Sequence, residues 1–167
     1  DKTGTITEGK PVVTDIQVFG NFTNEQALQL AASSEQYSEH PLAPALLRSA
    51  EAESIPLLAS KAFQALSGRG LSVTIAEPHI LLGYAKLMTE SAIEIDQAVA
   101  IAEKFASEAK TPVYLAADGE LVAVIAIADQ VKPSSQAAIQ ALHQMGLEVV
   151  MLTGDNAKTA QAIAEQV

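Results

Sequence analysis

The first residues of the chain could support transfer of a phosphoryl group. Asp1 places a carboxylate in a segment rich in threonine and glycine, and Lys2 follows it directly. A carboxylate in such a loop can act as a nucleophile toward phosphorus. The Lys2 ammonium group, backbone N–H groups and a metal ion could stabilise the phosphoryl oxygens. An isolated acidic residue at a chain end is usually only solvated, so this interpretation depends on the rest of the sequence.

Two further groups could recognise a flat polar ligand. His40 can hydrogen-bond through either ring nitrogen and stack on a ring, and the Glu35 carboxylate can accept from an amino group. Gly68 and Gly70 lack Cβ atoms, so the backbone there could approach a ligand closely, although a plain turn is the alternative. No strand-to-helix unit surrounds these glycines, which argues against a dinucleotide-binding fingerprint.

Composition restricts the class of protein. The 167 residues include 10 Lys and Arg against 20 Asp and Glu, with a formal net charge of -10, and 49% are hydrophobic. This is enough apolar material for a packed core, whereas the negative charge disfavours binding to nucleic acid. Cysteine is absent, which excludes disulfides, zinc–thiolate sites and thiol catalysis. No apolar run reaches the ~18–20 residues that span a bilayer.

The middle of the chain predicts helices packed on an antiparallel sheet. Thr23 and Gln26 have the spacing of a capping box, Pro41 suits a first helical position, and Asp118-Gly119 suits a hairpin turn. Val99 is expected on the buried side of its helix. The expected strands are 11–19, 62–66, 71–76, 80–84, 112–116 and 121–128, and the expected helices are 24–34, 41–50 and 95–110.

The end of the chain predicts a different architecture. A helix is expected over 134–145, an apolar strand over 147–152, a loop at Thr153-Gly154-Asp155 and a helix over 156–167. This order is typical of a parallel α/β sheet. We therefore expect an α+β domain, residues 12–126, inserted in an incomplete α/β domain formed by residues 1–11 and 127–167. The inserted domain is expected to be the stable unit.

Several motifs resemble those of P-type ATPases. The segment DKTGTIT at residues 1–7 resembles the family's phosphorylation signature, with Ile6 where leucine is usual. Five further segments follow in the family's order and resemble its heavy-metal-transporting branch: SEHPLA at 38–43, GRG at 68–70, Gly83 with KLM at 86–88, Asp129 with Lys132, and MLTGDN at 151–156. Together they cover nearly the whole chain.

The resemblance implies a role for each motif. Asp1 would accept the γ-phosphoryl group of ATP, and the Asp1 carboxylate and Thr3 carbonyl would assist Mg²⁺. The implied catalytic set is Asp1, Lys2, Thr3, Thr153, Gly154 and Asp155. The implied nucleotide site is Glu35, His40, Gly68, Gly70, Gly83 and Tyr84. The fold would be an α+β nucleotide-binding domain, an antiparallel sheet flanked by helices, within a truncated haloacid-dehalogenase-like (Rossmann-like) phosphorylation domain. For Asp155, capping of the next helix is the alternative role.

The resemblance also implies a larger parent. That parent would move a heavy-metal cation across a plasma or inner membrane, and this chain would lie on the cytosolic side. Copper is the expected ion, because the KLM segment resembles the copper group. The partners would be transmembrane helices, an actuator domain and the rest of the phosphorylation domain of the same polypeptide. The chain lacks the family's other magnesium-binding aspartate segment, so we expect it to bind ATP through adenine without completing turnover.

Two departures and two alternatives accompany this interpretation. Val73 stands where a third glycine is frequent, and Tyr84 stands where asparagine is usual, which would alter the adenine pocket.

A soluble haloacid-dehalogenase-like phosphatase with a cap domain is one alternative. It predicts a second aspartate two residues after the first, where this chain has Thr3. A nucleotide-binding module without catalysis is the other alternative.

Overall fold

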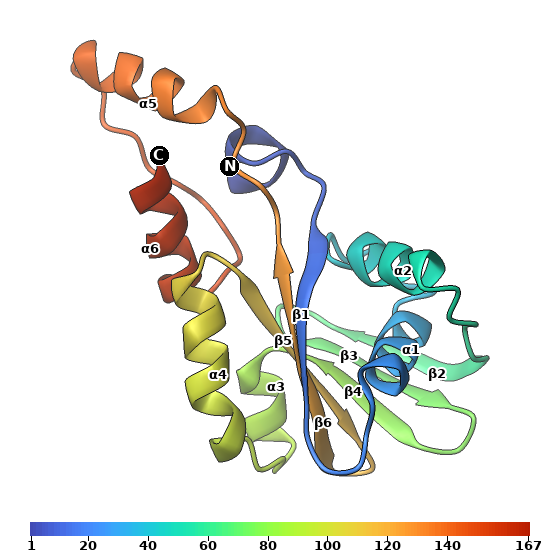
Figure 1. Ribbon diagram of the computed structural model, residues 1–167. Helices are drawn as coiled ribbons and strands as arrows, with labels where there is room; N and C mark the ends of the chain where they lie inside the picture. The colour runs from blue at the N-terminus through green and yellow to red at the C-terminus, as the bar shows by residue number, and fades with distance from the viewer.

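A six-stranded antiparallel sheet forms the centre of the molecule (Figure 1). The computed structural model describes all residues, 1–167. The strands lie in the order β1-β6-β5-β4-β3-β2. They are β1 (Val12–Val18), β2 (Ser60–Leu66), β3 (Gly70–Ile75), β4 (His79–Gly83), β5 (Thr111–Ala117) and β6 (Glu120–Ala128). The inner strands β5 and β6 are buried along most of their length, as their almost continuous apolar sequences require.

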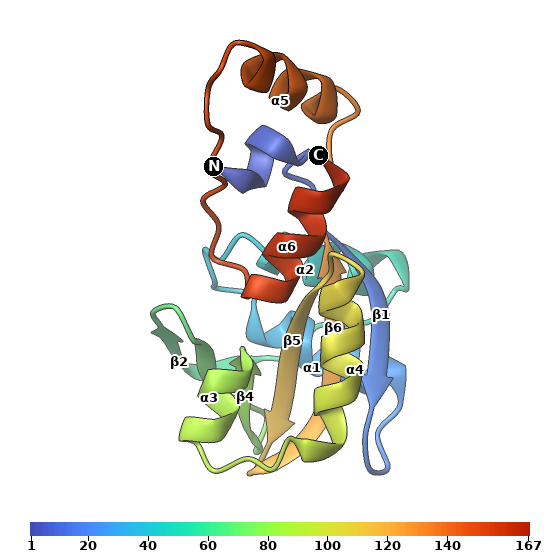
Figure 2. The ribbon, with the colours of Figure 1, turned by 90° about the vertical axis from the view of Figure 1, so that its left-hand side faces the viewer.

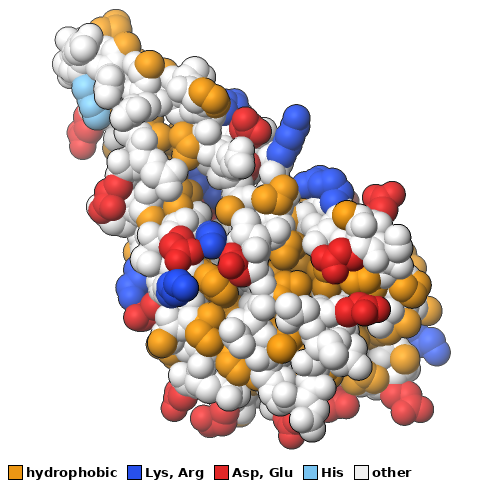
Figure 3. Space-filling view, viewed as in Figure 1, with side chains coloured by type: hydrophobic (Ala, Val, Ile, Leu, Met, Phe, Trp, Pro, Cys, Tyr) orange, Lys and Arg blue, Asp and Glu red, His pale blue; other side chains and the backbone are white.

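Helices cover both faces of this sheet (Figures 1 and 2). One apolar cluster joins the sheet to α1 (Asn24–Ser34) and α2 (Ala43–Ala52), and a second joins it to α3 (Ala85–Glu90) and α4 (Asp96–Ser107). The predicted capping box is present: Gln26 N donates to Thr23 Oγ1, and Thr23 N donates to Gln26 Oε1. We call residues 12–128 the sheet lobe. Figure 3 shows acidic side chains along its lower edge.

The remaining residues, 1–11 and 129–167, form a small lobe at one end of the sheet. It contains a wide turn, η1 (Lys2–Ile6), closed by a bond from Thr7 N to the Lys2 carbonyl, and the helices α5 (Ser135–Gln144) and α6 (Ala157–Gln166). The two segments of this lobe are held together by a β-bridge between Thr7 and Val131 and by bonds from Lys132 Nζ to the Gly4 carbonyl and from Ser135 Oγ to the Ile6 carbonyl. None of the helices in the molecule has the length and apolarity needed to cross a bilayer.

One sequence prediction about the small lobe is wrong. Residues 147–152 form no strand, although their composition is apolar. Apart from the Leu147 N–H that closes α5, the backbone of this segment makes one hydrogen bond, accepted by the Leu152 carbonyl from Lys2 N–H. A strand needs a neighbouring strand to pair with, and none lies beside this segment. The side chains of Leu147, Val150 and Leu152 are consequently exposed.

Two smaller predictions about the sheet lobe are wrong, and one helix was not predicted. Helix α2 begins at Ala43 rather than Pro41, and Pro44 occupies its first turn. Val99 is 42% exposed, because α4 turns this side chain away from the sheet. The six-residue helix α3 was not expected, since one and a half turns are too short to show helical periodicity. Strand β6 ends at Ala128, as the sequence predicted.

Candidate functional site

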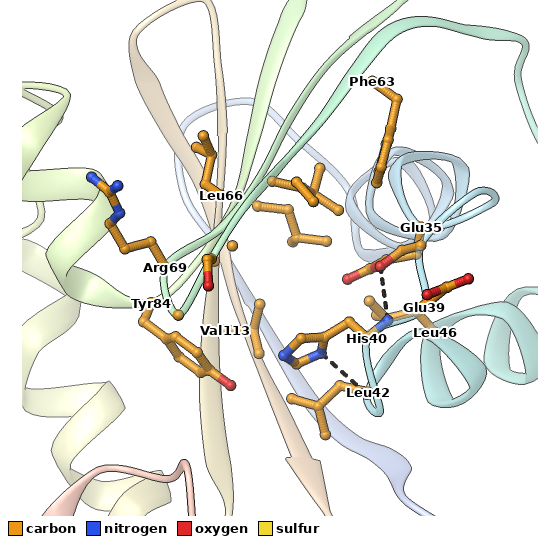
Figure 4. Close-up of a pocket in the computed structure, with 18 of the residues that line it drawn as sticks. Glu35, Glu39, His40, Leu42, Leu46, Phe63, Leu66, Arg69, Tyr84 and Val113 are labelled. Atoms are coloured by element: carbon orange, nitrogen blue, oxygen red, sulfur yellow. Dashed lines mark hydrogen bonds between the residues drawn. The ribbon is translucent and has the colours of Figure 1, made fainter.

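All six residues predicted to hold a nucleotide line one cavity (Figure 4). The cavity measures about 360 Å³ and lies between the end of α1, the segment before α2 and the turn that joins β2 to β3. Glu35, His40, Gly68, Gly70, Gly83 and Tyr84 therefore come together from distant parts of the chain. A cavity of this size suits a small organic ligand.

The floor of the cavity is apolar, and sequence reasoning missed the residues that form it. Side chains from α2, β2, β5 and β6 meet there, among them Leu46, Phe63, Val113 and Ile127. Each of these residues looks like an ordinary core residue in the sequence. Only their pairing in the sheet brings them to one place, so no local signal could have identified them.

Glu35 is the most unusual residue of the cavity. It follows α1 directly and is only 6% exposed, and its Oε2 atom has no hydrogen-bond partner. Burial raises the pKa of the Glu35 carboxyl, and a hydrogen bond with Ser38 opposes that shift. Buried polar atoms in proteins are almost always paired. An unpaired oxygen that lines a cavity therefore indicates a place for a ligand donor.

His40 and Tyr84 both line the cavity, and their rings point toward each other (Figure 4). Their ring centroids are 6.4 Å apart, with an interplanar angle of 62°. The Nδ1 atom of His40 accepts from Leu42 N at 3.2 Å, so the proton of the neutral ring belongs on Nε2, which can donate to a ligand. Burial lowers the pKa of His40, which favours this neutral form. Burial and the charges of Asp155 and Glu35 raise the pKa of Tyr84.

Two of the three glycines are required by strand packing. Gly70 and Gly83 face each other across β3 and β4. A Cβ atom on Gly70 would collide with the Leu82 carbonyl oxygen, and one on Gly83 would collide with the Arg69 carbonyl oxygen. Gly68 has a φ of +67° with open space around it, as a turn requires. The sequence alone could not show which glycines are needed for close strand packing and which one for a turn.

The residues predicted to handle phosphate gather in the small lobe around a buried ion pair. Lys2 Nζ lies 2.7 Å from Asp155 Oδ2, and both side chains are less than a tenth exposed. Thr153 Oγ1 donates to the same oxygen at 2.9 Å, and Thr111 Oγ1 donates to Asp155 Oδ1 at 2.8 Å. Burial alone would raise the pKa of Asp155, but the hydrogen bond and charge of Lys2, with both threonines, lower it overall.

The first residues of α6 show which side chain caps this helix. Asn156, not Asp155, caps α6, because its Oδ1 atom accepts from Thr159 N at 3.0 Å. The capping role considered for Asp155 is therefore wrong. Lys2 N–H also donates to the Leu152 carbonyl at 3.0 Å, so the DKTG and TGD segments lie against each other. Asp1, Thr3 and Gly154 are exposed on the surface of this loop pair.

The donors available for a divalent cation are few. The small lobe offers the exposed Asp1 carboxylate and the Thr3 carbonyl, and no group of three His, Asp or Glu side chains in the molecule could hold a metal ion. Mg²⁺ is usually bound by one or two carboxylates, with waters and substrate phosphates completing its shell. The donor set therefore fits Mg²⁺ bound together with a phosphate ligand.

Asp129 fastens the connection between the two lobes. Its carboxylate accepts from Thr7 Oγ1 at 2.6 Å, Gly9 N at 3.2 Å and Lys10 N at 3.0 Å. These bonds tie the strand that leaves the sheet lobe to the segment that enters it. The sequence singled out Asp129 by its motif, whereas Thr7 could be recognised as its partner only in the structure.

Comparison with known proteins identifies the family. The profile of the haloacid dehalogenase-like hydrolases matches residues 1–167. The chain belongs to this family. It is 44% identical over 167 residues to a copper-exporting P-type ATPase of Staphylococcus saprophyticus, and this match spans all of the chain and 20% of that relative. The chain thus corresponds to about a fifth of the relative's length.

Solved structures agree with this assignment. The chain superposes on a zinc-transporting PIB-type ATPase in its E2.Pi state with a TM-score of 0.74 and 31% identity, covering 99% of this chain and 26% of that one. It also matches the catalytic domain of a CPx-ATPase that changes conformation upon nucleotide binding, with a TM-score of 0.72 and 25% identity over 99% of this chain and 55% of that one. The resemblance and the fold predicted from the motifs are thereby confirmed.

Proposed function

We propose that this chain is the ATP-binding catalytic region of a metal-transporting P-type ATPase. Residues 12–126 form its nucleotide-binding domain, and residues 1–11 and 127–167 form part of its phosphorylation domain. The observation that carries the proposal is the unpaired, buried Oε2 atom of Glu35 in an apolar cavity. The exocyclic amino group of adenine supplies the missing donor, and the apolar floor covers the faces of the ring.

Charge favours a division of labour between the lobes. Residues 15–128 contain 6 basic and 14 acidic residues, which gives this segment a net charge of -8. Such a lobe is poorly suited to hold a triphosphate but can hold a neutral base. The base therefore supplies most of the affinity, and we expect a dissociation constant on the order of 10 µM to 1 mM. The phosphates extend past His40 and Tyr84 toward the small lobe.

Phosphoryl transfer takes place at Asp1. A carboxylate oxygen of Asp1 attacks the γ-phosphorus of ATP, the bond from that phosphorus to its bridging oxygen breaks, and ADP leaves with the electron pair. Thr3, Thr153 and Gly154 contact the phosphoryl oxygens, while the Lys2–Asp155 ion pair fixes the two segments that carry them. Mg²⁺, held by the Asp1 carboxylate and the Thr3 carbonyl, supplies neutralising charge when bound. Turnover requires parts of the parent beyond this chain.

The parent is proposed to move copper. The copper-exporting relative is 44% identical, against 31% for the zinc-transporting structure. Transmembrane helices, an actuator domain and the rest of the phosphorylation domain are the proposed partners, with this chain on the cytosolic side of a plasma or inner membrane. Stimulation of ATP hydrolysis by Cu⁺ but not Zn²⁺, measured on the full-length protein, is the expected result. Stimulation by Zn²⁺ alone would replace copper in the proposal.

Titration with ATP, followed through the backbone amide signals by NMR, tests the nucleotide site. We expect shifts concentrated at Glu35, His40, Gly68 and Gly83, and an affinity at least about tenfold lower in His40→Ala. The matched control is His143→Ala, because His143 is exposed on α5, outside the cavity. An unchanged spectrum at several millimolar ATP, or equal losses in both variants, would contradict the proposed site.

A further inference from the structure

Helix α6 of the small lobe rests against the sheet lobe near the end of α4 (Figure 2). Three polar contacts cross between the lobes here. Thr111 Oγ1 donates to Asp155 Oδ1 at 2.8 Å, Thr159 Oγ1 donates to the Lys110 carbonyl at 2.9 Å, and Lys158 Nζ lies 2.8 Å from Glu103 Oε1. These bonds are separate from the Asp129 connection between the lobes.

The contact through Asp155 differs from the other two. Both donors to Oδ2, Lys2 and Thr153, belong to the small lobe. Oδ1 takes its hydrogen bond from Thr111, the first residue of β5, which is 4% exposed. A buried carboxylate needs donors on both oxygens, and bonds to a charged acceptor are the stronger kind. Separation of the lobes would leave Oδ1 to water alone.

Part of this interface, around the start of α6, is hollow. A cavity of about 570 Å³ lies between α4 and the start of α6, with Tyr84, Val99 and Pro112 on one side and Gly154 and Lys158 on the other. Apolar packing is therefore interrupted at the start of α6, although Ile163 further along this helix is buried. The Lys158–Glu103 pair is more than half exposed on both sides, so it contributes little. Among the polar contacts, the hydrogen bonds of Thr111 and Thr159 remain as those that hold α6 in place.

We infer that Thr111 is a positioning residue that latches the Thr153–Asp155 loop to the sheet lobe. While the latch is closed, both carboxylate oxygens of Asp155 are engaged and the two lobes keep one relative arrangement. Tyr84 lines both this cavity and the nucleotide cavity, so the latch adjoins the wall of the nucleotide site. The functional meaning of the latch rests on the role proposed for Asp155, whereas the contact between the lobes does not.

Distance measurement between two spin labels tests the latch. The chain contains no cysteine, so Gln97→Cys on α4 and Gln140→Cys on α5, both exposed positions, provide the two label sites. In the labelled protein with the native Thr111 we expect one narrow distance distribution. Thr111→Val keeps the shape and the strand preference but removes the hydroxyl. It should lower the docked-to-undocked ratio by about tenfold or more and broaden the distribution.

Two further variants make the result specific. Thr111→Ser restores the hydroxyl and should restore the narrow distribution, while Thr14→Val changes a strand threonine that does not contact α6 and should leave it unchanged. A narrow, unshifted distribution in Thr111→Val would overturn the latch. Should that variant fail to fold, Thr159→Val carries the same test from the α6 side. AMP affinity of the same samples reports on the nucleotide site separately, so loss of the latch and failure of the proposed function are distinguishable.

Discussion

Replacement of Glu35 by methionine is expected to strengthen the fold while it weakens nucleotide binding. The side chain is 6% exposed and its Oε2 atom is unpaired, so the folded protein carries the desolvation cost of that oxygen, about 1–3 kcal/mol. Methionine has a similar length and no polar group that needs a partner. Loss of the carboxylate's interaction with Ser38 offsets part of this gain. We therefore expect Glu35→Met to raise the free energy of unfolding by about 1 kcal/mol.

The same change should remove the acceptor for the adenine amino group. A hydrogen bond to a charged acceptor contributes about 1.5–3 kcal/mol, so AMP affinity should fall about 10- to 100-fold. Urea unfolding gives the stability, and AMP titration by amide NMR gives the affinity. Glu39→Gln is the matched control, since Glu39 lines the same cavity but is exposed, and it should change both quantities little.

The pH dependence of the stability difference has a definite sign. Burial raises the pKa of Glu35 in the folded state above its ordinary value, so the unfolded chain releases this proton first as pH rises. Native Glu35 is therefore least costly below the ordinary glutamate pKa. Its cost grows through the window up to the raised pKa, and the advantage of Glu35→Met should grow over the same window. A destabilised Glu35→Met protein with unchanged AMP affinity would refute this reasoning.

Other substitutions test the packing and the ion pair. Gly83→Ala should lower the free energy of unfolding by about 3 kcal/mol or more, measured with urea, because the added Cβ meets the backbone carbonyl of Arg69. Gly68 has open space around it, so Gly68→Ala should lower the same quantity by only about 1 kcal/mol. Equal losses in the two variants would contradict the close approach of β3 and β4. Asp155→Asn leaves the Lys2 ammonium group buried without a counter-charge. It should lower the free energy of unfolding by about 3–5 kcal/mol, measured by heat or urea. A loss below about 1 kcal/mol would show that the ion pair is solvated. Because the pKa of Asp155 is lowered, its stabilising effect is present above the ordinary aspartate pKa, and acid titration of unfolding should show it lost as pH falls through the lowered value.

Local patterns were sufficient for most of the sheet lobe. The capping box at Thr23 and the Asp118-Gly119 turn each depend on neighbouring residues, and both are present in the structure. The residues predicted to hold a nucleotide were singled out mostly by contiguous motifs, and they line one cavity. Phe63 and Val113 were not found, since nothing but strand pairing brings them to the cavity. The strand expected over 147–152 failed for a related reason: apolar composition predicts burial, but a strand exists only where a partner strand is available.

The pairing of β1 with β6 has a consequence for synthesis of the protein. Val12 pairs with Ala128, which follows 116 residues later in the chain. At roughly 5–20 residues per second, the ribosome delivers β6 about 6–23 s after β1. Until then β1 has no strand to pair with, and Asp129 cannot reach the Thr7 hydroxyl or the Gly9 and Lys10 amides. The segment that carries the proposed nucleophile, Asp1, is therefore ordered only after the whole sheet lobe has been made. A nascent chain exposes Asp1 without the residues that surround it in the folded protein, and so it cannot use ATP.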